Sequence, residues 1–509
     1  MHKIRIMKKE VINVIASLSI MVFACCNKNK KTEIITSSSS KSISGENNGI
    51  LNGPDYLKNL EFKNDYPTNE SVSKLYDAID FQRACQAYIW AMPTVALNEL
   101  YYGLHRDGGY NFNDMNVLEA YATSENIGLT ANNNTIYGLA AIDLSKAGPV
   151  VVESPLGVYG CIDDWWQRPI TEIGPLGPDK GKGGKFLLIP PGYDKKLPAG
   201  YFNITSSTNK VLYLGRAFVK NGDLHIASGT LKQTKIYPYS QKGNPPATKI
   251  FNGSLKTNTI APRGFEYWKR LSEIINSEPV QERDRFFIAM LKPLGIEKGK
   301  PFNPDERQKR ILTEAANFGF RMTQTISMAP RTENIVAYTG THWELVLPLN
   351  PNQETPNYSQ LDERADYTFE AITIAAGMIL KVPGVGSQYY SVAKDKNGDW
   401  LDGGENYVLH IPANVPAKEF WSVIVYDNST RSIIANGVSK TSVSSNDKSQ
   451  INSDGSIDVY FGPTAPQGKE SNWIKTIPNK GWFTYFRWYG PTEAFFNKNW
   501  KLGDIEKLK

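Results

Sequence analysis

The first candidate for chemistry is an acidic and aromatic segment at residues 162–168, IDDWWQR. Side chains of an extended chain alternate between two faces, so Asp163 would share a face with Trp165, and Asp164 with Trp166. A carboxylate beside an indole suits a sugar or an amphipathic ligand, because one group accepts hydrogen bonds while the other stacks. We therefore take Asp163 and Asp164 as catalytic candidates and Trp165 as a ligand-binding candidate. The alternative is that the tryptophans belong to the core and the aspartates to a turn.

The second candidate is the aromatic run at residues 482–489, WFTYFRWY. An alternating strand would place Tyr485, Arg487 and Tyr489 on one face and both tryptophans on the other. The tryptophan face suits a core. The tyrosine and arginine face can line a pocket for an anionic or aromatic ligand, because arginine offers fixed hydrogen-bond donors and stacks on rings. These three residues are ligand-binding candidates.

Each buried arginine needs a partner for its charge, which a protein carboxylate or a ligand can supply. For Arg487 the alternative to a ligand is a structural carboxylate such as Asp427 or Glu419. Arg216 poses the same question, because it lies in the otherwise apolar run 211–218, VLYLGRAF. We add Arg216 to the catalytic candidates.

The motifs of several enzyme and metal-binding classes are absent from the sequence. It has no Gly-x-Ser-x-Gly motif of a serine hydrolase, and Gly181–Lys185, GKGGK, lacks the spacing of a phosphate loop. The histidines are isolated rather than grouped as zinc ligands, and His410 fits a structural role. The run 395–399, DKNGD, lacks the glycine and glutamate of a calcium loop and fits a hairpin turn. We expect no metal site and no cofactor.

The elements that would position these residues are clearest in the C-terminal part. Tyr407–Ile411 alternates between apolar and polar residues, whereas Phe420–Tyr426 is apolar on both faces. The first pattern is typical of a half-buried strand and the second of a strand covered on both sides. We therefore place Phe420–Tyr426 at the centre of a sheet, with Tyr407–Ile411 near its edge as a possible partner. Residues 482–489 close the same β-sandwich.

The N-terminal half begins with a helix and then changes to strands. Apolar residues recur at helical spacing after a cap at Thr68 or Asn69, and we expect Pro93 to break or kink this helix. Residues 263–328 return to helical spacing, and Tyr367–Leu380 is predicted as a further helix. Between these helices lie short strands punctuated by glycine and proline: Thr135–Leu144, Val150–Glu153, Val158–Asp164, Phe186–Pro190 and Val211–Phe218.

The N-terminus has the pattern of a secretion signal. Basic residues precede the apolar run Val11–Ala24, which is too short to span a membrane. Ala24 before Cys25 resembles a bacterial lipoprotein box, so we predict that Cys25 is lipidated, with Cys26 or an ordinary signal peptide as alternatives. The polar stretch that follows fits a tether. These features predict a protein anchored by lipid in the bacterial cell envelope, on the periplasmic or outer face.

Net charge and cysteine usage limit the partners. The formal net charge is +6 over 509 residues, and the first 24 residues contribute +3 of it. So small a charge gives no reason to expect binding to nucleic acid. In an oxidising compartment Cys85 and Cys161 could pair, but we expect both to be buried and unpaired.

Several blocks resemble two families. The blocks NNNTIYGLAAIDLSKAGPVVVESP at 132–155, GKFLLIPPGY at 184–193 and LGRAF at 214–218 resemble domain of unknown function 1254. The blocks YVLHIPANVPAKEFWSVIVYD, INSDGSIDVYFGP, NW and FTYFRWYGP, between residues 407 and 491, resemble domain of unknown function 1214. The resemblance implies two jelly-roll-like domains around a helical section, and no settled activity. Where such proteins tend to have Asn-x-Asp-Thr, this chain has Asn134 in place of the aspartate.

We therefore predict an α+β fold that is mainly β, with two jelly-roll-like antiparallel β-sandwich domains, a helical section between them and a helical N-terminal segment. The predicted segments are a signal peptide at 1–24, a lipidated polar tether at 25–64, an N-terminal domain of helices and a β-sandwich at 65–260, the helical section at 261–385 and the C-terminal β-sandwich at 386–509.

Three functions fit these features. The first is an extracytoplasmic enzyme acting on a small polar or glycan-like substrate in a cleft between the sandwiches. The second is a lipoprotein that binds a glycan or small molecule, and the third is a structural or assembly protein that forms homo-oligomers. A deep pocket with two or more close carboxylates of shifted pKa would favour the enzyme, to which we lean. A shallow strip of exposed tryptophan and tyrosine would favour binding, and a large flat apolar patch would favour assembly.

Overall fold

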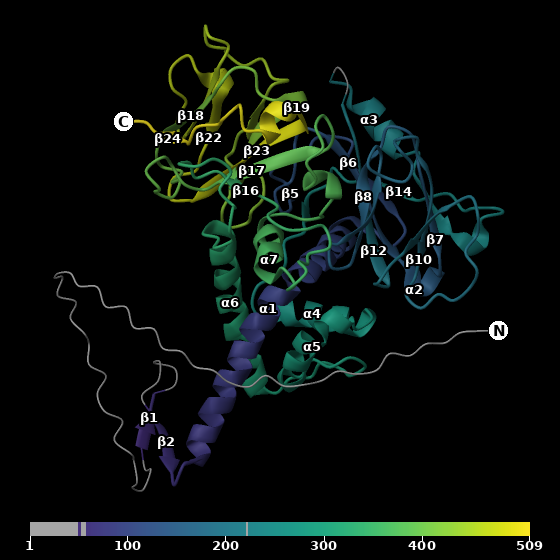
Figure 1. Ribbon diagram of the computed structural model, residues 1–509, viewed down its shortest axis with the longest axis vertical. Helices are drawn as coiled ribbons and strands as arrows, with labels where there is room; N and C mark the ends of the chain where they lie inside the picture. Colours follow the sequence, from purple (N-terminus) through teal and green to yellow (C-terminus); the bar gives the residue numbers. More distant parts are fainter. Residues whose placement is uncertain (1–48, 52–57, 220–221) are drawn as a thin grey trace, which may run out of the picture.

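Two sheet-rich bodies and a layer of helices make up the α+β fold that the sequence predicts (Figure 1). The computed structural model describes residues 49–51, 58–219 and 222–509. The predicted signal peptide and the lipidation site Cys25 lie outside these residues. At the N-terminal end of the described part, β1 (Gly49–Leu51), β2 (Leu60–Lys63) and β3 (Tyr66–Pro67) form a small sheet.

The N-terminal body is a sandwich of a six-stranded and a four-stranded sheet. The larger sheet has the order β14 (Ile250–Asn252), β4 (Met115–Val117), β6 (Ile136–Asp143), β12 (Lys210–Ala217), β8 (Tyr159–Asp164) and β9 (Pro169–Ile173). The smaller sheet has the order β11 (Phe202–Thr205), β10 (Gly184–Ile189), β7 (Val150–Ser154) and β13 (Lys235–Pro238). Valine, isoleucine and leucine side chains from both sheets fill the core between them. Most pairs are antiparallel, as expected, but β10–β11 and β4–β14 are parallel.

The C-terminal body is a second sandwich. One sheet has the order β16 (Glu344–Leu345), β17 (Ser387–Val392), β23 (Trp482–Pro491), β19 (Ala417–Asp427) and β20 (Ser442–Ser444). The other has the order β22 (Trp473–Lys475), β21 (Ile457–Gly462), β18 (Tyr407–Ile411) and β24 (Glu506–Lys507). Val423 and Trp488 from the first sheet meet Leu409 and Phe461 from the second in one core.

The placement of β18 corrects one detail of the sequence analysis. Tyr407–Ile411 is a strand with the predicted alternation, but it pairs with β21 and β24 rather than with β19. The two strands face each other across the sandwich core instead. Pro412 and Pro416 lie in the connection between them, which crosses from one sheet to the other. The most central strand of the five-stranded sheet is β23, with β19 beside it.

Helices form a layer that packs against both bodies. The helices of this layer are α1 (Asn69–Gly108), α4 (Phe265–Ser277), α5 (Arg285–Leu291), α6 (Glu306–Met328) and α7 (Leu361–Glu370). In Figure 1 α1 runs from the small sheet at the bottom of the view up to the junction of the two bodies, beside α6. None of the helices in the described ranges is long and apolar enough to cross a bilayer.

Two helices end at other residues than the sequence predicts, and Pro93 does not break the first of them. Thr68 caps α1 as expected, but the helix continues through Pro93 to Gly108. Here Gln167 donates to the carbonyl of Pro93, and Arg364 donates to the carbonyl of Trp90. Proline has no backbone N–H, so one intrahelical hydrogen bond is missing at this point of α1. The two side chains from other elements donate to backbone carbonyls close to it.

The second wrong boundary concerns the helix predicted at Tyr367–Leu380. The helix α7 ends at Glu370, and residues 371–375 are irregular. Their backbone N–H groups donate to side chains of the N-terminal sandwich instead of to helical carbonyls. Gln167 accepts from Thr373, and Asp163 accepts from Ile374.

Candidate functional site

A cavity of about 430 Å³ lies where the two sandwiches and the helical layer meet. Strands β6, β8, β9 and β12 of the N-terminal body supply one side, and strands β17, β19 and β23 of the C-terminal body supply another. Segment 371–378, which is irregular up to Ala375 and ends in the 3-10 helix η5 (Ala376–Met378), closes it from the helical layer. The cavity lies at the junction where the sequence predicts a ligand site, which stays a prediction.

Arg487 enters this cavity from β23, the central strand. Its guanidinium donates to the hydroxyl of Tyr426 at 2.5 Å and to the carbonyl of Thr130 at 3.0 Å. The guanidinium carbon also lies 5.0 Å from the ring centre of Tyr485 and 5.5 Å from that of Tyr389. Arg487 is only 5% exposed, yet it forms no ion pair with a carboxylate in the described ranges. The alternative, in which a structural carboxylate pairs with Arg487, is therefore not found among the described residues.

Arg216 enters from β12, on the N-terminal side. It donates to the hydroxyl of Ser387 at 2.9 Å, and its guanidinium carbon lies 5.7 Å from the ring centre of Tyr489. It too has no carboxylate within ion-pair distance among the residues described. The register between β12 and β6 pairs Arg216 with Tyr137, which lines the cavity as well.

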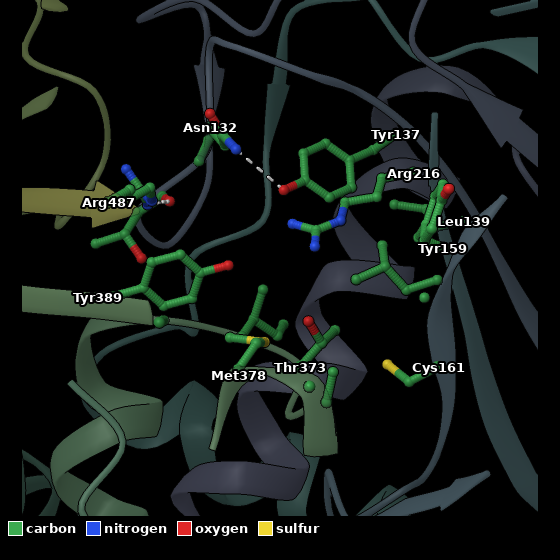
Figure 2. A pocket seen from close by; sticks show the side chains of 18 of the residues that line it. Asn132, Tyr137, Leu139, Tyr159, Cys161, Arg216, Thr373, Met378, Tyr389 and Arg487 are labelled. Atoms are coloured by element: carbon green, nitrogen blue, oxygen red, sulfur yellow. Dashed lines mark hydrogen bonds between the residues drawn. The ribbon is translucent and has the colours of Figure 1, made fainter. Parts of the chain in front are cut away.

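Hydroxyl and amide groups surround the two arginines. The amide of Asn132 donates to the hydroxyl of Tyr489 at 2.5 Å and to that of Tyr137 at 3.1 Å. Figure 2 shows the guanidinium of Arg216 and the hydroxyls of Tyr137 and Tyr389 pointing into the same space. Burial works to lower the pKa of Arg487, but the neighbouring tyrosines raise it above its ordinary value, so the group stays charged. This end of the cavity is polar and positively charged.

The rest of the cavity is mainly apolar. Figure 2 shows Met378 and the thiol of Cys161 away from the arginines, and Leu139 beside Arg216. Further apolar side chains line it: Leu100, Leu104, Ile173, Leu176, Leu214 and Val346. Burial raises the pKa of Cys161 well above the ordinary range, so this thiol is neutral and a poor nucleophile. Cys161 and Cys85 are both buried and unpaired, as we expected.

Glu172 is the acidic group within the N-terminal wall. It lies on β9 opposite Cys161 on β8, and it accepts a hydrogen bond from the backbone N–H of Ala376 at 2.5 Å. Burial raises its pKa to about 7, although the N–H groups of Ala376 and Gly377 and the charge of Arg216 act to lower it.

The segment 371–378 is held against the N-terminal sheet by several short contacts. Glu172 and Asp163 both accept from its backbone. Thr373 has a φ of 68°, which is a strained conformation for a β-branched residue. At Gly386 a Cβ would lie 2.1 Å from the carbonyl oxygen of Gly377, so only glycine allows β17 to begin this close to the segment. These contacts fix one wall of the cavity.

The other predicted residues lie outside the cavity lining. Asp163 is completely buried beside it, where burial raises its pKa well above the ordinary range. Asp164 accepts from the backbone of Trp166 and pairs with Arg168 at 2.6 Å, which is the turn we had considered as the alternative. Trp165 is fully buried in the helical core. Of the sequence candidates, Arg216, Tyr485 and Arg487 line the cavity, and Tyr489 contacts it through Asn132.

Sequence reasoning missed Asn132, Tyr137, Glu172 and Tyr389. Asn132 and Tyr137 belong to the block NNNTIYG, in which only Asn134 was considered, because it replaces an aspartate. It is Asn132 that lines the cavity, while the side-chain oxygen of Asn134 is buried without a partner. Glu172 and Tyr389 lie in short strands with no distinctive neighbours. In the part of the chain that is described, no three acidic, histidine or cysteine side chains are grouped to hold a metal ion.

Two solved structures resemble this chain. The VPA0106 protein from Vibrio parahaemolyticus matches with a TM-score of 0.52 and 19% sequence identity, over 84% of this chain and 100% of that chain. A putative uncharacterized protein from Burkholderia cenocepacia matches with a TM-score of 0.38 and 12% identity, over 86% and 96% of the two chains. At this level of identity the first likeness shows the fold alone. No curated protein matches the chain.

Family models match both sheet-rich bodies. Residues 112–238 match the model of domain of unknown function 1254, and residues 386–493 match that of domain of unknown function 1214. The two matches cover most of the N-terminal sandwich and most of the C-terminal one. The chain therefore carries domains of unknown function 1254 and 1214, in the order that the sequence resemblance predicted.

Proposed function

We propose that the protein binds a small organic acid in this cavity, and that it does so as a lipid-anchored protein outside the cytoplasm. The observation that carries the proposal is the pair Arg216 and Arg487, which line one cavity without a carboxylate partner in the described ranges. A buried guanidinium without an anionic partner is costly. A ligand carboxylate would supply that partner, with planar geometry that matches the arginine fork.

Free donor capacity supports an anionic ligand. A guanidinium carries five N–H donors. Arg487 uses two of them in the contacts with Tyr426 and Thr130, and Arg216 uses one in its contact with Ser387. The hydroxyls of Tyr137 and Tyr389 add further groups on the same side of the cavity. The polar end can therefore hold a carboxylate through several hydrogen bonds.

The size and lining of the cavity limit the rest of the ligand. A volume of about 430 Å³ accommodates one small molecule and falls in the usual range of small-molecule pockets. The apolar end, with Leu139, Leu214 and Met378, suits an aliphatic or aromatic body. Such a ligand has an anionic head at the arginines and an apolar part toward segment 371–378.

A second candidate function is an enzyme acting on such an acid. The observation that favours it is Glu172, whose carboxyl group lines the cavity with a pKa raised by burial to about 7. A carboxyl group that titrates near neutral pH can act as a general acid or base. Binding of the acid is common to both functions, so it is the property to test first.

Thermal melts with a ligand panel test the proposed binding. The panel contains benzoate, phenylacetate, glucuronate and galacturonate, each at millimolar concentration. We expect at least one acid to raise the melting temperature of the wild type, because a ligand that binds only the folded state stabilises it. Arg487→Ala and Arg216→Ala should abolish this increase, since each removes half of the proposed carboxylate site.

The matched control is Arg270→Ala. Arg270 is also largely buried, but it pairs with Glu99 at 3.1 Å and does not line the cavity. Its loss should lower the melting temperature of the free protein and leave the ligand-induced increase intact. If no acid of the panel stabilises the wild type, or if Arg487→Ala and Arg216→Ala respond as the wild type does, the proposed function is wrong.

A further inference from the structure

Glu172 is the carboxyl group of the cavity wall that has no cationic partner at ion-pair distance among the residues described. Its Oε1 atom accepts from the backbone N–H of Ala376, and it lies in the same cavity as Arg216 and Arg487. Besides the paired Lys418 and Glu419, the lining of this cavity thus contains two cations and one carboxyl group without an ion-pair partner among the residues described. An incoming anion would be attracted by the first two and repelled by the third when it is ionised.

The groups around Glu172 leave Arg216 as its principal charged neighbour. From β8, Asp163 and Cys161 face it; burial raises the pKa of both well above the ordinary range, which keeps the thiol neutral and favours the neutral form of Asp163. From β12, Arg216 acts to lower the pKa of Glu172. Segment 376–378 contributes backbone N–H groups without charge. The N–H groups of Ala376 and Gly377 favour the ionised form of Glu172 most, and Arg216 adds the favourable effect of a full charge.

We propose that Glu172 is a specificity-determining residue of the cavity, and that an organic acid binds there together with one proton taken up by Glu172. The inference rests on the proposed binding of an acid at Arg216 and Arg487. A ligand carboxylate paired with Arg216 cancels the one charge that helps the two N–H groups to stabilise ionised Glu172, and it adds a negative charge to the same cavity. Both effects favour protonation. The proton comes from the buffer, and no covalent bond is changed.

This coupling makes the binding affinity depend on the charge of the ligand as well as on pH. With Glu172 protonated, the cavity presents two positive charges and a carboxylic acid that can donate a hydrogen bond. With Glu172 ionised, the same wall repels a second acidic group. The cavity should therefore favour monocarboxylates over dicarboxylates of similar size, and the preference should grow as the pH rises above the pKa of Glu172, which is about 7.

Isothermal titration calorimetry of the full-length protein tests the proposal, with benzoate and glucuronate as probes. Titration in two buffers of different ionisation enthalpy gives the number of protons taken up on binding. We expect about 0 protons at about pH 5.5, about 0.5 at about pH 7, and a value approaching 1 at about pH 8.5. The affinity of the wild type should fall by up to about tenfold per pH unit above about pH 7, as linkage requires for one proton.

Glu172→Gln gives the decisive comparison. A glutamine side-chain oxygen can still accept the hydrogen bond from Ala376, so the wall should keep its shape. This variant should bind without proton uptake at any pH, and up to about thirtyfold more tightly than the wild type at about pH 8.5. The control is Glu344→Gln. Glu344 also has a pKa that burial raises, to about 8, but it lines a separate small pocket. The Glu344→Gln variant should therefore take up protons on ligand binding as the wild type does.

The possible results separate the two proposals. If the wild type binds a probe without proton uptake at about pH 8.5, or if Glu172→Gln retains the uptake, the inference on Glu172 is wrong while the acid site stands. If neither probe gives a binding heat at any pH, the proposed function is contradicted, and the inference falls with it.

Discussion

Glu370 is a carboxyl group that the folded protein holds in its helical core. The hydroxyl of Tyr485 donates to one of its oxygens at 2.6 Å, and the hydroxyl of Ser327 donates to the other at 3.0 Å. Burial nevertheless raises its pKa from 4.5 to about 7. A group whose pKa is raised by folding stabilises the protein fully below its unfolded pKa, and this contribution is lost as the pH rises through its folded pKa.

This residue gives a prediction for the pH dependence of stability. Glu370→Gln should raise the free energy of unfolding by up to about 3 kcal/mol at about pH 8, because it removes the cost of a buried negative charge. At about pH 4 the difference should nearly vanish, since Glu370 is then protonated. Urea denaturation at several pH values measures this. Parallel stability profiles of wild type and variant from about pH 4 to 8 would show the prediction to be wrong.

The residues of the site differ in how far the sequence could reveal them. Arg216 and Arg487 stood out because a charge inside an apolar strand needs a partner, and both line the cavity. Asp164 and Trp165 also stood out, as a carboxylate and an indole in one short segment. The chain turns at residues 165–167, however, so Asp164 stabilises the turn and Trp165 belongs to the core. Glu172 gave no signal, because its role depends on strands and loops that only folding brings together.

Strand β19 carries a prediction at the scale of one element. Trp421 is 5% exposed, and its ring is stacked on that of Phe486 on the neighbouring strand at 5.5 Å. Trp421→Ala should lower the free energy of unfolding by about 3–5 kcal/mol, as truncation of a large core side chain does. Trp400→Ala is the control, because Trp400 is 54% exposed, and its loss should cost less than about 1 kcal/mol. Chemical denaturation of both variants provides the comparison. A loss below about 1 kcal/mol for Trp421→Ala would mean that this face of β19 is not part of the core.

The positions of the strands were predicted better than the strands with which they pair. The runs at 407–411, 420–426 and 482–489 are all strands, because alternation and unbroken apolar runs reflect burial directly. Pairing was less accessible, and β18 joins the opposite sheet. The helix through Pro93 and the early end of α7 were missed because side chains from distant elements bond to those backbones. Local patterns contain no information about such donors and acceptors.

The attachment of the whole molecule is the subject of the last prediction. Cys25 follows an apolar run and precedes a polar stretch, and it lies outside the described residues. Cys25→Ser should move the protein from the membrane fraction to the soluble fraction of bacterial cells, because the thiol is the proposed site of lipid attachment. Detergent phase partitioning followed by immunoblotting measures this. A Cys26→Ser variant is the control and should stay in the detergent phase. If the wild type never enters the detergent phase, the lipoprotein prediction is wrong.

The two faces of β23 have a consequence for how such a protein can diverge. Trp482, Phe486 and Trp488 belong to the sandwich core, whereas Tyr485 and Arg487 line the cavity. Because neighbouring positions of a strand face opposite ways, a substitution at one set leaves the other set in place. Selection for a new ligand can therefore act on alternate codons of this segment, while selection for folding conserves the codons between them. In an alignment of related sequences, variable and constant columns would alternate along this strand.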